Sequence, residues 1–187
     1  MANFSAAFGY DFEIVPVRNE LITDFNAAPS ISGVNPASDA TVSYADGVFT
    51  IASTAYTMDG TDAPIRLASL TAASLETDTG SEDIYTYDDE TSGFNQSVAT
   101  TKSFSISLSG VADFNDVGYK VLRLTEQNTV ADGLRVAFKR VGPTGTTEEI
   151  TGYGTLTGYT ESNEVTSIVS WECTLTGYGP CHLTLAS

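Results

Sequence analysis

Residues 104–109 alternate strictly between apolar and small polar side chains, in the order Phe-Ser-Ile-Ser-Leu-Ser. A period of two is the period of a β-strand, in which successive side chains point to opposite faces of a sheet. Phe104, Ile106 and Leu108 are therefore expected on a buried face and the serines on the other. The segment is predicted to be a strand with one apolar and one polar side.

The composition extends this interpretation to the whole chain. Threonine, serine, valine, tyrosine and glycine dominate its local sequence, and these residues favour strands and turns. With 187 residues, 41% of them hydrophobic, the chain has the size of one domain and enough apolar surface for a core. The predicted fold is mainly β: a single domain 1–187, built as an antiparallel β-sandwich or barrel with one flanking α-helix and long loops or arms.

One helix is predicted over residues 113–127. Asp113 or Asn115 can cap its first turn by accepting backbone N–H bonds, and Asp116 suits the positive end of the helix dipole. Apolar residues recur at spacings of three and four and form one stripe, made of Phe114, Val117, Val121 and Leu124. An amphipathic helix of this kind buries its stripe against a sheet.

Further strands are predicted on both sides of the helix. Residues 11–17 and 48–53 are rich in strand-forming residues, and Pro16 restricts the first segment to a sheet edge or a bulge, because proline cannot donate a ladder hydrogen bond. After the helix, residues 134–141 alternate between apolar and other side chains. Their partner strand is expected over about 148–160.

A last long strand places apolar residues on one face: Val165, Val169, Trp171, Cys173 and Leu175. A short apolar piece follows at 183–185. The side chains predicted to pack the core are Phe104, Ile106, Leu108, Val117, Val121, Leu124, Val136, Phe138, Val169, Trp171 and Leu175.

Two segments carry no clear period. Residues 1–11 are interpreted as an N-terminal arm. Residues 57–100 are interpreted as a long acidic loop insertion, which we expect another chain to order, because loops of this length are rare inside a compact domain. The acidic residues proposed for an inter-subunit contact there are Glu76, Asp78, Glu82, Asp83, Asp88, Asp89 and Glu90.

The charge restricts the possible partners. The chain has 24 acidic and 8 basic residues and a formal net charge of −16, and residues 1–101 contain only two of the bases, Arg18 and Arg66. Ordinary binding to nucleic acid or to anionic membranes needs Lys and Arg, so both are disfavoured. No apolar stretch approaches the ~18 residues of a membrane span, and the first residues lack the pattern of a secretory signal. We expect folding in a reducing cytoplasm.

The sequence gives little support for an enzyme. His182 is the only histidine, and its neighbour Cys181 would point to the opposite face of a strand. Cys173, Cys181 and His182 do not have the spacing of a compact zinc motif, so free thiols are expected. The acidic segment lacks the residue order of an EF-hand, and no glycine loop for nucleotides is present. No catalytic, metal-binding or cofactor-binding residue is predicted.

Three similar segments, Ile150–Gly154, Leu156–Tyr159 and Leu175–Gly179, each contain a glycine followed by a tyrosine. Glycine permits bulges and tyrosine gives a broad contact surface. Bulged strand ends and an interface between subunits explain the pattern equally well.

The C-terminal half resembles the tail tube (major tail) proteins of bacteriophages. The resemblance covers about residues 100–187 and depends on the order of its parts. These are Thr101–Gly110 followed directly by one helix, the strand Leu134–Val141, the stretch Gly152–Thr157, and the final strand Ser170–Gly179. The first hundred residues add no motif of the family.

The resemblance implies a structural subunit of the virion tail, assembled in the host cytoplasm as six-fold rings that stack into a hollow tube. Strands of neighbouring subunits would continue one sheet around the lumen, and loops and termini would bridge adjacent rings. Partners would be further copies of the chain and the tape measure, terminator and baseplate or tip proteins, with DNA only as passing cargo and no membrane. A negative lumen wall would keep DNA from adhering.

Two other interpretations remain open on the sequence. One is a different β-protein of a virion or injection machine, such as a decoration protein, a tail terminator or a secretion-tube protein. The other is an extracellular carbohydrate-binding or adhesive β-sandwich.

Overall fold

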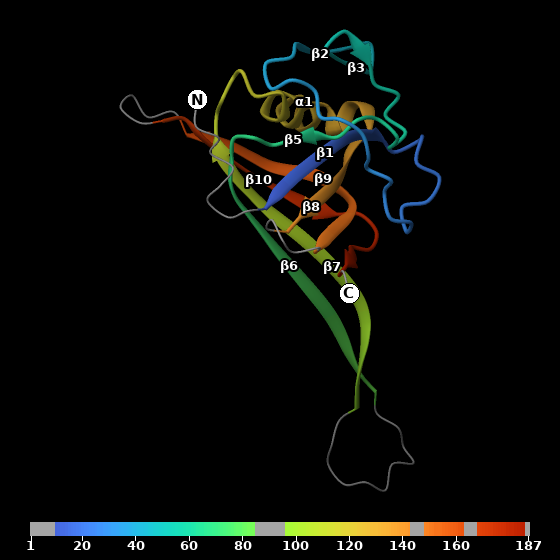
Figure 1. Ribbon diagram of the computed structural model, residues 1–187. Helices are drawn as coiled ribbons and strands as arrows, with labels where there is room; N and C mark the ends of the chain where they lie inside the picture. The colour runs from blue at the N-terminus through green and yellow to red at the C-terminus, as the bar shows by residue number, and fades with distance from the viewer. Residues whose placement is uncertain (1–9, 85–95, 143–147, 163–167, 186–187) are drawn as a thin grey trace, which may run out of the picture.

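The computed structural model describes residues 10–84, 96–142, 148–162 and 168–185 (Figure 1). Its elements are β1 (Asp11–Arg18), β2 (Val42–Ala45), β3 (Val48–Ile51), β4 (Thr54–Ala55), β5 (Ile65–Arg66), β6 (Leu70–Ile84), β7 (Gln96–Val111), α1 (Val117–Asp132), β8 (Leu134–Val141), β9 (Glu149–Ser162), β10 (Ser170–Gly177) and β11 (His182–Thr184). The prediction of a mainly β fold with one helix is confirmed.

Eight strands form one antiparallel sheet in the order β5-β1-β8-β9-β10-β7-β6, and β11 pairs with the beginning of β9. A small sheet of β2, β3 and β4 lies beside α1, on the same side of the main sheet (Figure 1). The main sheet is strongly twisted, so that β1 crosses the direction of β7 in the view of Figure 1.

The alternating segment 104–109 lies in β7, between β10 and β6. Phe104, Ile106 and Leu108 are all at most 6% exposed. They pack with Trp171 and Leu175 of β10 and with the buried residues of α1 in the main core. The period of two therefore places the apolar side chains as the sequence indicates, because a strand covered on one face buries alternate residues.

The helix differs from its predicted bounds. It begins at Val117, and its N-cap is Asp116, whose side chain accepts a hydrogen bond from the Gly118 N–H. It continues past residue 127 to Asp132 and ends at Gly133 in the left-handed conformation, with φ of 61°. Phe114, predicted for the apolar stripe, precedes the helix and is 57% exposed.

The buried face of α1 consists of Val117, Gly118, Tyr119, Val121, Leu122 and Thr125. Leu124, which was predicted for the core, is only partly buried. Val169 is also partly buried and lies just before β10, which begins at Ser170. Val165 lies outside the described residues.

Strand β1 explains how the sheet tolerates Pro16. The strand pairs with β8 along its whole length, but β5 pairs with it only at Glu13 and Ile14. Phe12, Pro16 and Arg18 are separated by even numbers of residues, so their backbone groups point to the same side of β1. On that side, away from β8, the Phe12 carbonyl accepts from the Leu67 N–H and the Arg18 N–H donates to the Met58 carbonyl. The missing N–H of Pro16 therefore faces a side of β1 that no described strand covers at that position.

The prediction of a loop over residues 57–100 is wrong for much of its length. Residues 70–84 form β6, which pairs with β7 from Leu70 to Ile84. The sequence of β6 lacks an alternation of apolar and polar residues because most side chains of this hairpin are exposed on both faces. Neither face therefore requires apolar residues. Asp88, Asp89 and Glu90 lie outside the described residues, as do residues 1–9 of the predicted arm.

No helix among the described residues is long and apolar enough to cross a membrane.

Candidate assembly surface

Part of the main sheet has two open edges. Strand β9 pairs with β8 through Gly154, and from Thr155 to Ser162 the described strands pair with it only on the β10 side. At the other end of the sheet, β6 pairs with β7 and with no other strand in the part of the chain that the structure describes. The segments β9 (155–162), β10, β7 and β6 therefore form a four-stranded sheet whose two outer strands each have unpaired backbone groups. Such edges can accept a strand from another chain.

One face of this four-stranded sheet is polar, and no element among the described residues covers it; we call it the hydroxyl face. It consists of three rows of paired residues, each with one residue from β9, β10, β7 and β6 in that order. The rows are Thr160-Glu172-Ser109-Ala72, Thr157-Thr174-Ser107-Ser74 and Thr155-Thr176-Ser105-Glu76. Its side chains alternate with the buried residues of β7 and β10, and hydroxyls bond across the strands, as between Thr157 Oγ1 and Thr176 Oγ1 at 3.3 Å. The described rows contain no Lys or Arg.

The acids predicted for a contact divide between two places. Glu76 lies on the hydroxyl face, and Asp78, which pairs with Ser103, lies in the next row. Glu82 lies further out on the hairpin, and for Asp83 the structure describes only the backbone. Sequence reasoning missed Glu172, which joins Glu76 on this face only because β10 pairs with β7.

A shallow hollow of about 410 Å³ lies on the hydroxyl face beside Gly158, where β9 shifts register against β10. Its lining includes Glu172, several Ser and Thr hydroxyls, and Cys173. Burial raises the pKa of the Cys173 thiol to about 12, so the thiol stays protonated near neutral pH and is a poor nucleophile. The hollow therefore offers hydrogen bonds and no activated group.

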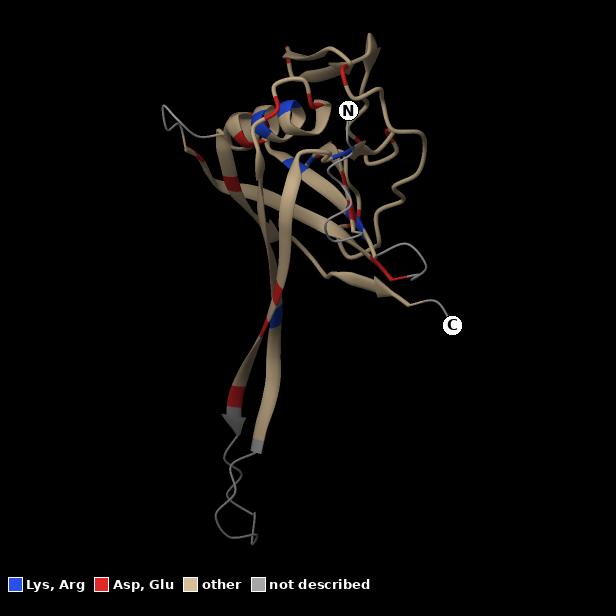
Figure 2. Ribbon diagram, turned by 60° about the vertical axis from the view of Figure 1, so that its left-hand side comes forward, with Lys and Arg blue, Asp and Glu red and all other residues tan. Residues whose placement is uncertain are grey.

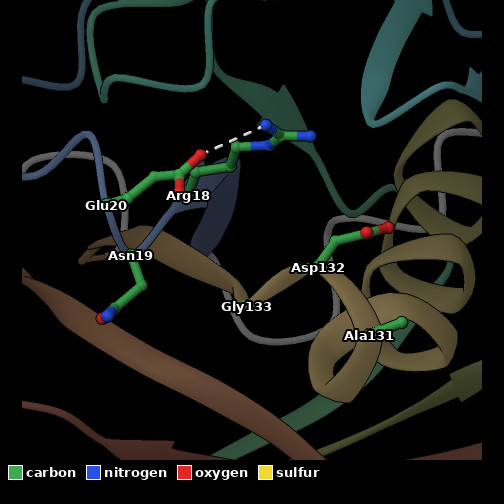
Figure 3. A pocket seen from close by; sticks show the side chains of 6 residues that line it. All are labelled: Arg18, Asn19, Glu20, Ala131, Asp132 and Gly133. Carbon is green, nitrogen blue, oxygen red and sulfur yellow. Dashed lines mark hydrogen bonds and ion pairs between the residues drawn. The ribbon is translucent and has the colours of Figure 1, made fainter.

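A second hollow of about 400 Å³ lies where β1 and α1 end (Figure 3), lined by Arg18, Asn19, Glu20, Ala131, Asp132 and Gly133. Its charged groups already have partners. Arg18 contacts Glu20 at 3.3 Å and donates to the Gly47 carbonyl at 2.6 Å, and Asp132 accepts from the Tyr44 hydroxyl at 2.6 Å. These contacts fasten the β2–β3 turn to the body, which is a structural role.

The outer part of the β6–β7 hairpin, residues 77–84 and 96–103, extends away from the body as an arm (Figures 1 and 2). The pairing of β7 with β10 ends at Ser105, so the arm is a ribbon of two strands. A two-stranded ribbon is marginally stable in water when nothing covers it. The arm is thus a second feature that contact with another chain would stabilise.

Asp116 fastens the base of the hairpin to the helix. Its Oδ2 accepts hydrogen bonds from the backbone N–H of Ser69 at 3.0 Å and from the Ser69 hydroxyl at 2.8 Å, while Oδ1 accepts from the Gly118 N–H at 3.0 Å. Asp116 is only 5% exposed. One carboxylate therefore positions the first residues of β6 relative to α1.

Of the thiol and imidazole groups, that of Cys173 lines the hollow on the hydroxyl face. Cys173 is buried in β10, Cys181 is half-buried, and His182 begins β11. Among the residues that the structure describes, no three His, Cys, Asp or Glu side chains group so that they could hold a metal ion.

Neither known family models nor curated protein sequences match this chain. Among solved structures, the SPP1 tail tube matches with a TM-score of 0.53 at 14% identity, over 82% of this chain and 80% of that chain. The chain has the fold of a tail tube protein. The tail of an empty gene transfer agent (GTA) particle, refined with C6 symmetry, matches with a TM-score of 0.50 at 18% identity, over 64% of this chain and 83% of that one. The resemblance to tail tube proteins is thereby confirmed at the level of the fold.

Proposed function

We propose that this chain is the structural subunit of a phage tail tube or a related tail. Copies join edge to edge into six-fold rings, and the rings stack into a hollow tube whose lumen conducts DNA during ejection. The observation that carries the proposal is the four-stranded sheet with two open edges and one uncovered polar face, in a chain with the tail tube fold.

The two open edges fit one another in direction. The four strands alternate in direction, so β9 runs opposite to β6. Rotation about a ring axis preserves strand direction relative to that axis. The β6 edge of one copy therefore meets the β9 edge of the next in an antiparallel pair, and the sheet continues from subunit to subunit. A head-to-tail contact of this kind closes when the rotation divides a full turn.

The size of the resulting barrel suits its proposed cargo. The tail of the gene transfer agent has C6 symmetry, and six copies of four strands, spaced by about 4.8 Å, give a backbone diameter of about 37 Å. Strand tilt widens such a barrel further. A channel of this width leaves room for a DNA duplex.

The hydroxyl face would line the lumen, because α1 and the small sheet cover the opposite face of the sheet (Figure 1). Glu76, Asp78 and Glu172 would then face the passing DNA. Carboxylates repel phosphates, and the described rows themselves contain no basic residue.

In this proposal the protein belongs to the virion tail and assembles in the host cytoplasm. Its main partner is itself. The tape measure, terminator and baseplate or tip proteins would contact the inside and the two ends of the tube.

Electron microscopy of the purified chain, together with amide hydrogen exchange, tests the proposal. Rings or tubes are expected, and on assembly the amides of β6 and of residues 155–162 should become protected. The amides of β10 are the internal control, because β10 is already paired on both sides. A chain that stays monomeric at high concentration, or tubes in which residues 155–162 exchange as in the monomer, would contradict the proposal.

A further inference from the structure

Exposed apolar side chains lie at two opposite ends of β9. Strand β11 pairs with residues Glu149–Thr151, the first residues of β9, and places Leu183 and Leu185 there. We call this the leucine end. The last residue of β9, Ser162, pairs with Ser170 of β10, which pairs in turn with Val111 of β7.

The chain segments next to this opposite end bring Phe114 and Ile168 to it. The N–H of Ala112 donates to the Val169 carbonyl at 2.9 Å, so the segment after β7 and the segment before β10 run side by side. We call this the phenylalanine end. The two ends are separated by the whole length of β9.

All four side chains are exposed. Leu183 and Leu185 are 57% and 66% exposed, and Phe114 and Ile168 are 57% and 74% exposed. Pairing with Ile150 holds Leu183, and an edge-to-face contact with Tyr119 at 5.7 Å holds the Phe114 ring. Burying such positioned apolar groups is favourable and costs little conformational entropy.

The closed barrel of the proposed function turns these two ends into the two faces of a ring. Barrel strands run along the axis with a tilt of about 35–45°, so one end of each strand lies on each face. A ring stacked in the same orientation brings the leucine end of one ring against the phenylalanine end of the next. Such a contact does not close on itself and makes a filament.

One pair of opposite charges would meet in this stacking, while Glu149 at the leucine end is already paired with Lys139 at 3.1 Å. Lys102, the only base on β6 or β7, is exposed at the base of the arm, on the same side of the body as the leucine end. Asp113 is exposed beside Phe114 at the phenylalanine end. Stacking therefore brings a cation and an anion to the same junction.

We propose that Leu183 and Leu185 of one copy pack on Phe114 and Ile168 of a copy in the adjacent ring, and that this apolar contact joins rings into a tube. The inference rests on the proposed function. Each subunit contributes a small contact, but a ring makes six at once, so the combined contact is strong through effective concentration.

A double variant, Leu183→Asp with Leu185→Asp, tests the contact by electron microscopy and by mass measurement in solution. Rings without tubes are expected, because stacking would bury two carboxylates in an apolar contact. Val130→Asp is the matched control, since Val130 is 96% exposed on α1, away from both ends of β9, and should still form tubes. Phe114→Asp changes the opposite end and should also give rings alone.

Mixing the double variant with wild-type protein gives a further test. The double variant retains its phenylalanine end, so it should cap wild-type tubes at one end only and shorten them when it is a minor component. Full-length tubes from the double variant and from Phe114→Asp would overturn the inference. Folded variants that form no rings would also overturn it, because the side chains would then act between neighbours within a ring. Wild-type protein that forms no rings refutes the proposed function itself.

Discussion

The two halves of the main sheet differ in how their faces are covered and their edges are paired. The half around β1 and β8 is covered on both faces: Ile14 and Phe138 lie in the main core, while Val15 and Ala137 lie in a second cluster on the opposite face. The half formed by β9 (155–162), β10, β7 and β6 is covered on one face and open along both edges. The first half is complete within one chain, and the second has the unpaired groups that further copies can satisfy.

The second cluster shows how the chain completes the first half. Phe25 packs edge-to-face on Tyr153 at 5.1 Å and on Tyr178 at 4.6 Å, and the Arg135 guanidinium lies 3.5 Å from the Tyr178 ring centre. Tyr153 and Tyr178 belong to two of the three similar segments in which a glycine precedes a tyrosine. In these two copies the tyrosine serves a contact within the chain.

The largest expected difference between the halves is in stability. Phe138→Ala should lower the free energy of unfolding by about 3–5 kcal/mol, because the ring is fully buried and packs on Phe12 and Phe104. Ser107→Ala on the hydroxyl face should change it by no more than about 0.5 kcal/mol. Denaturant unfolding of the monomer measures both. Equal losses would mean that the hydroxyl face is packed in the monomer and not uncovered.

Asp116→Ala should have the next largest effect, a loss of about 2 kcal/mol, because the change removes the helix cap and leaves the partly buried N–H of Ser69 without its acceptor. Asp113→Ala is the control, since Asp113 is exposed and its carboxylate accepts only from the Asn115 N–H among the described contacts. Thermal or denaturant unfolding compares the two. Amide exchange at the start of β6 should rise in the Asp116 variant alone, and an unchanged rate there would contradict its role in fixing the hairpin.

Arg135→Met should cost about 1 kcal/mol, through loss of the cation–π contact with Tyr178 and of hydrogen bonds to Asn19 and Thr155. Lys120→Met is a suitable control for removing one positive charge, because Lys120 lies in α1 and is absent from the described ion pairs. Near-ultraviolet circular dichroism should report the loosened tyrosines in the Arg135 variant. A stability loss equal to that of the control would remove Arg135 from the second cluster.

Reversing the charge of the open half should leave the monomer almost unchanged. The triple variant Glu76→Lys, Asp78→Lys and Glu172→Lys should alter unfolding by only about 0.5 kcal/mol, since these side chains are exposed. Its effect should appear in function, as slower DNA ejection from particles whose tubes carry it, with the delay reduced by added salt. Unchanged ejection from particles with a verified basic lumen would contradict the lining role of these acids.

The sequence predicted those parts of the fold whose pattern is local. Examples are the alternation of apolar and polar residues in β7, β8 and β10 and the three- and four-residue spacing of apolar residues in α1. Both are side-chain periods that a few neighbouring residues reveal. It failed at β6, whose polar residues on both faces leave no period, and at the N-cap, where Asp116 rather than Asp113 or Asn115 caps the helix. For the candidate surface it found Glu76 and Asp78 but not Glu172.

By itself, the sequence determined a β-rich chain with one helix, a strongly acidic surface and a resemblance to tail tube proteins. Only the tertiary structure decided which strands keep open edges, which acids share a face, and that Ser69 and Asp116, 47 residues apart, meet. The physical reason is that edges and faces belong to pairs of strands. Hydrogen-bond pairing between distant segments defines these edges and faces. The sequence of a single segment does not show which other segment pairs with it.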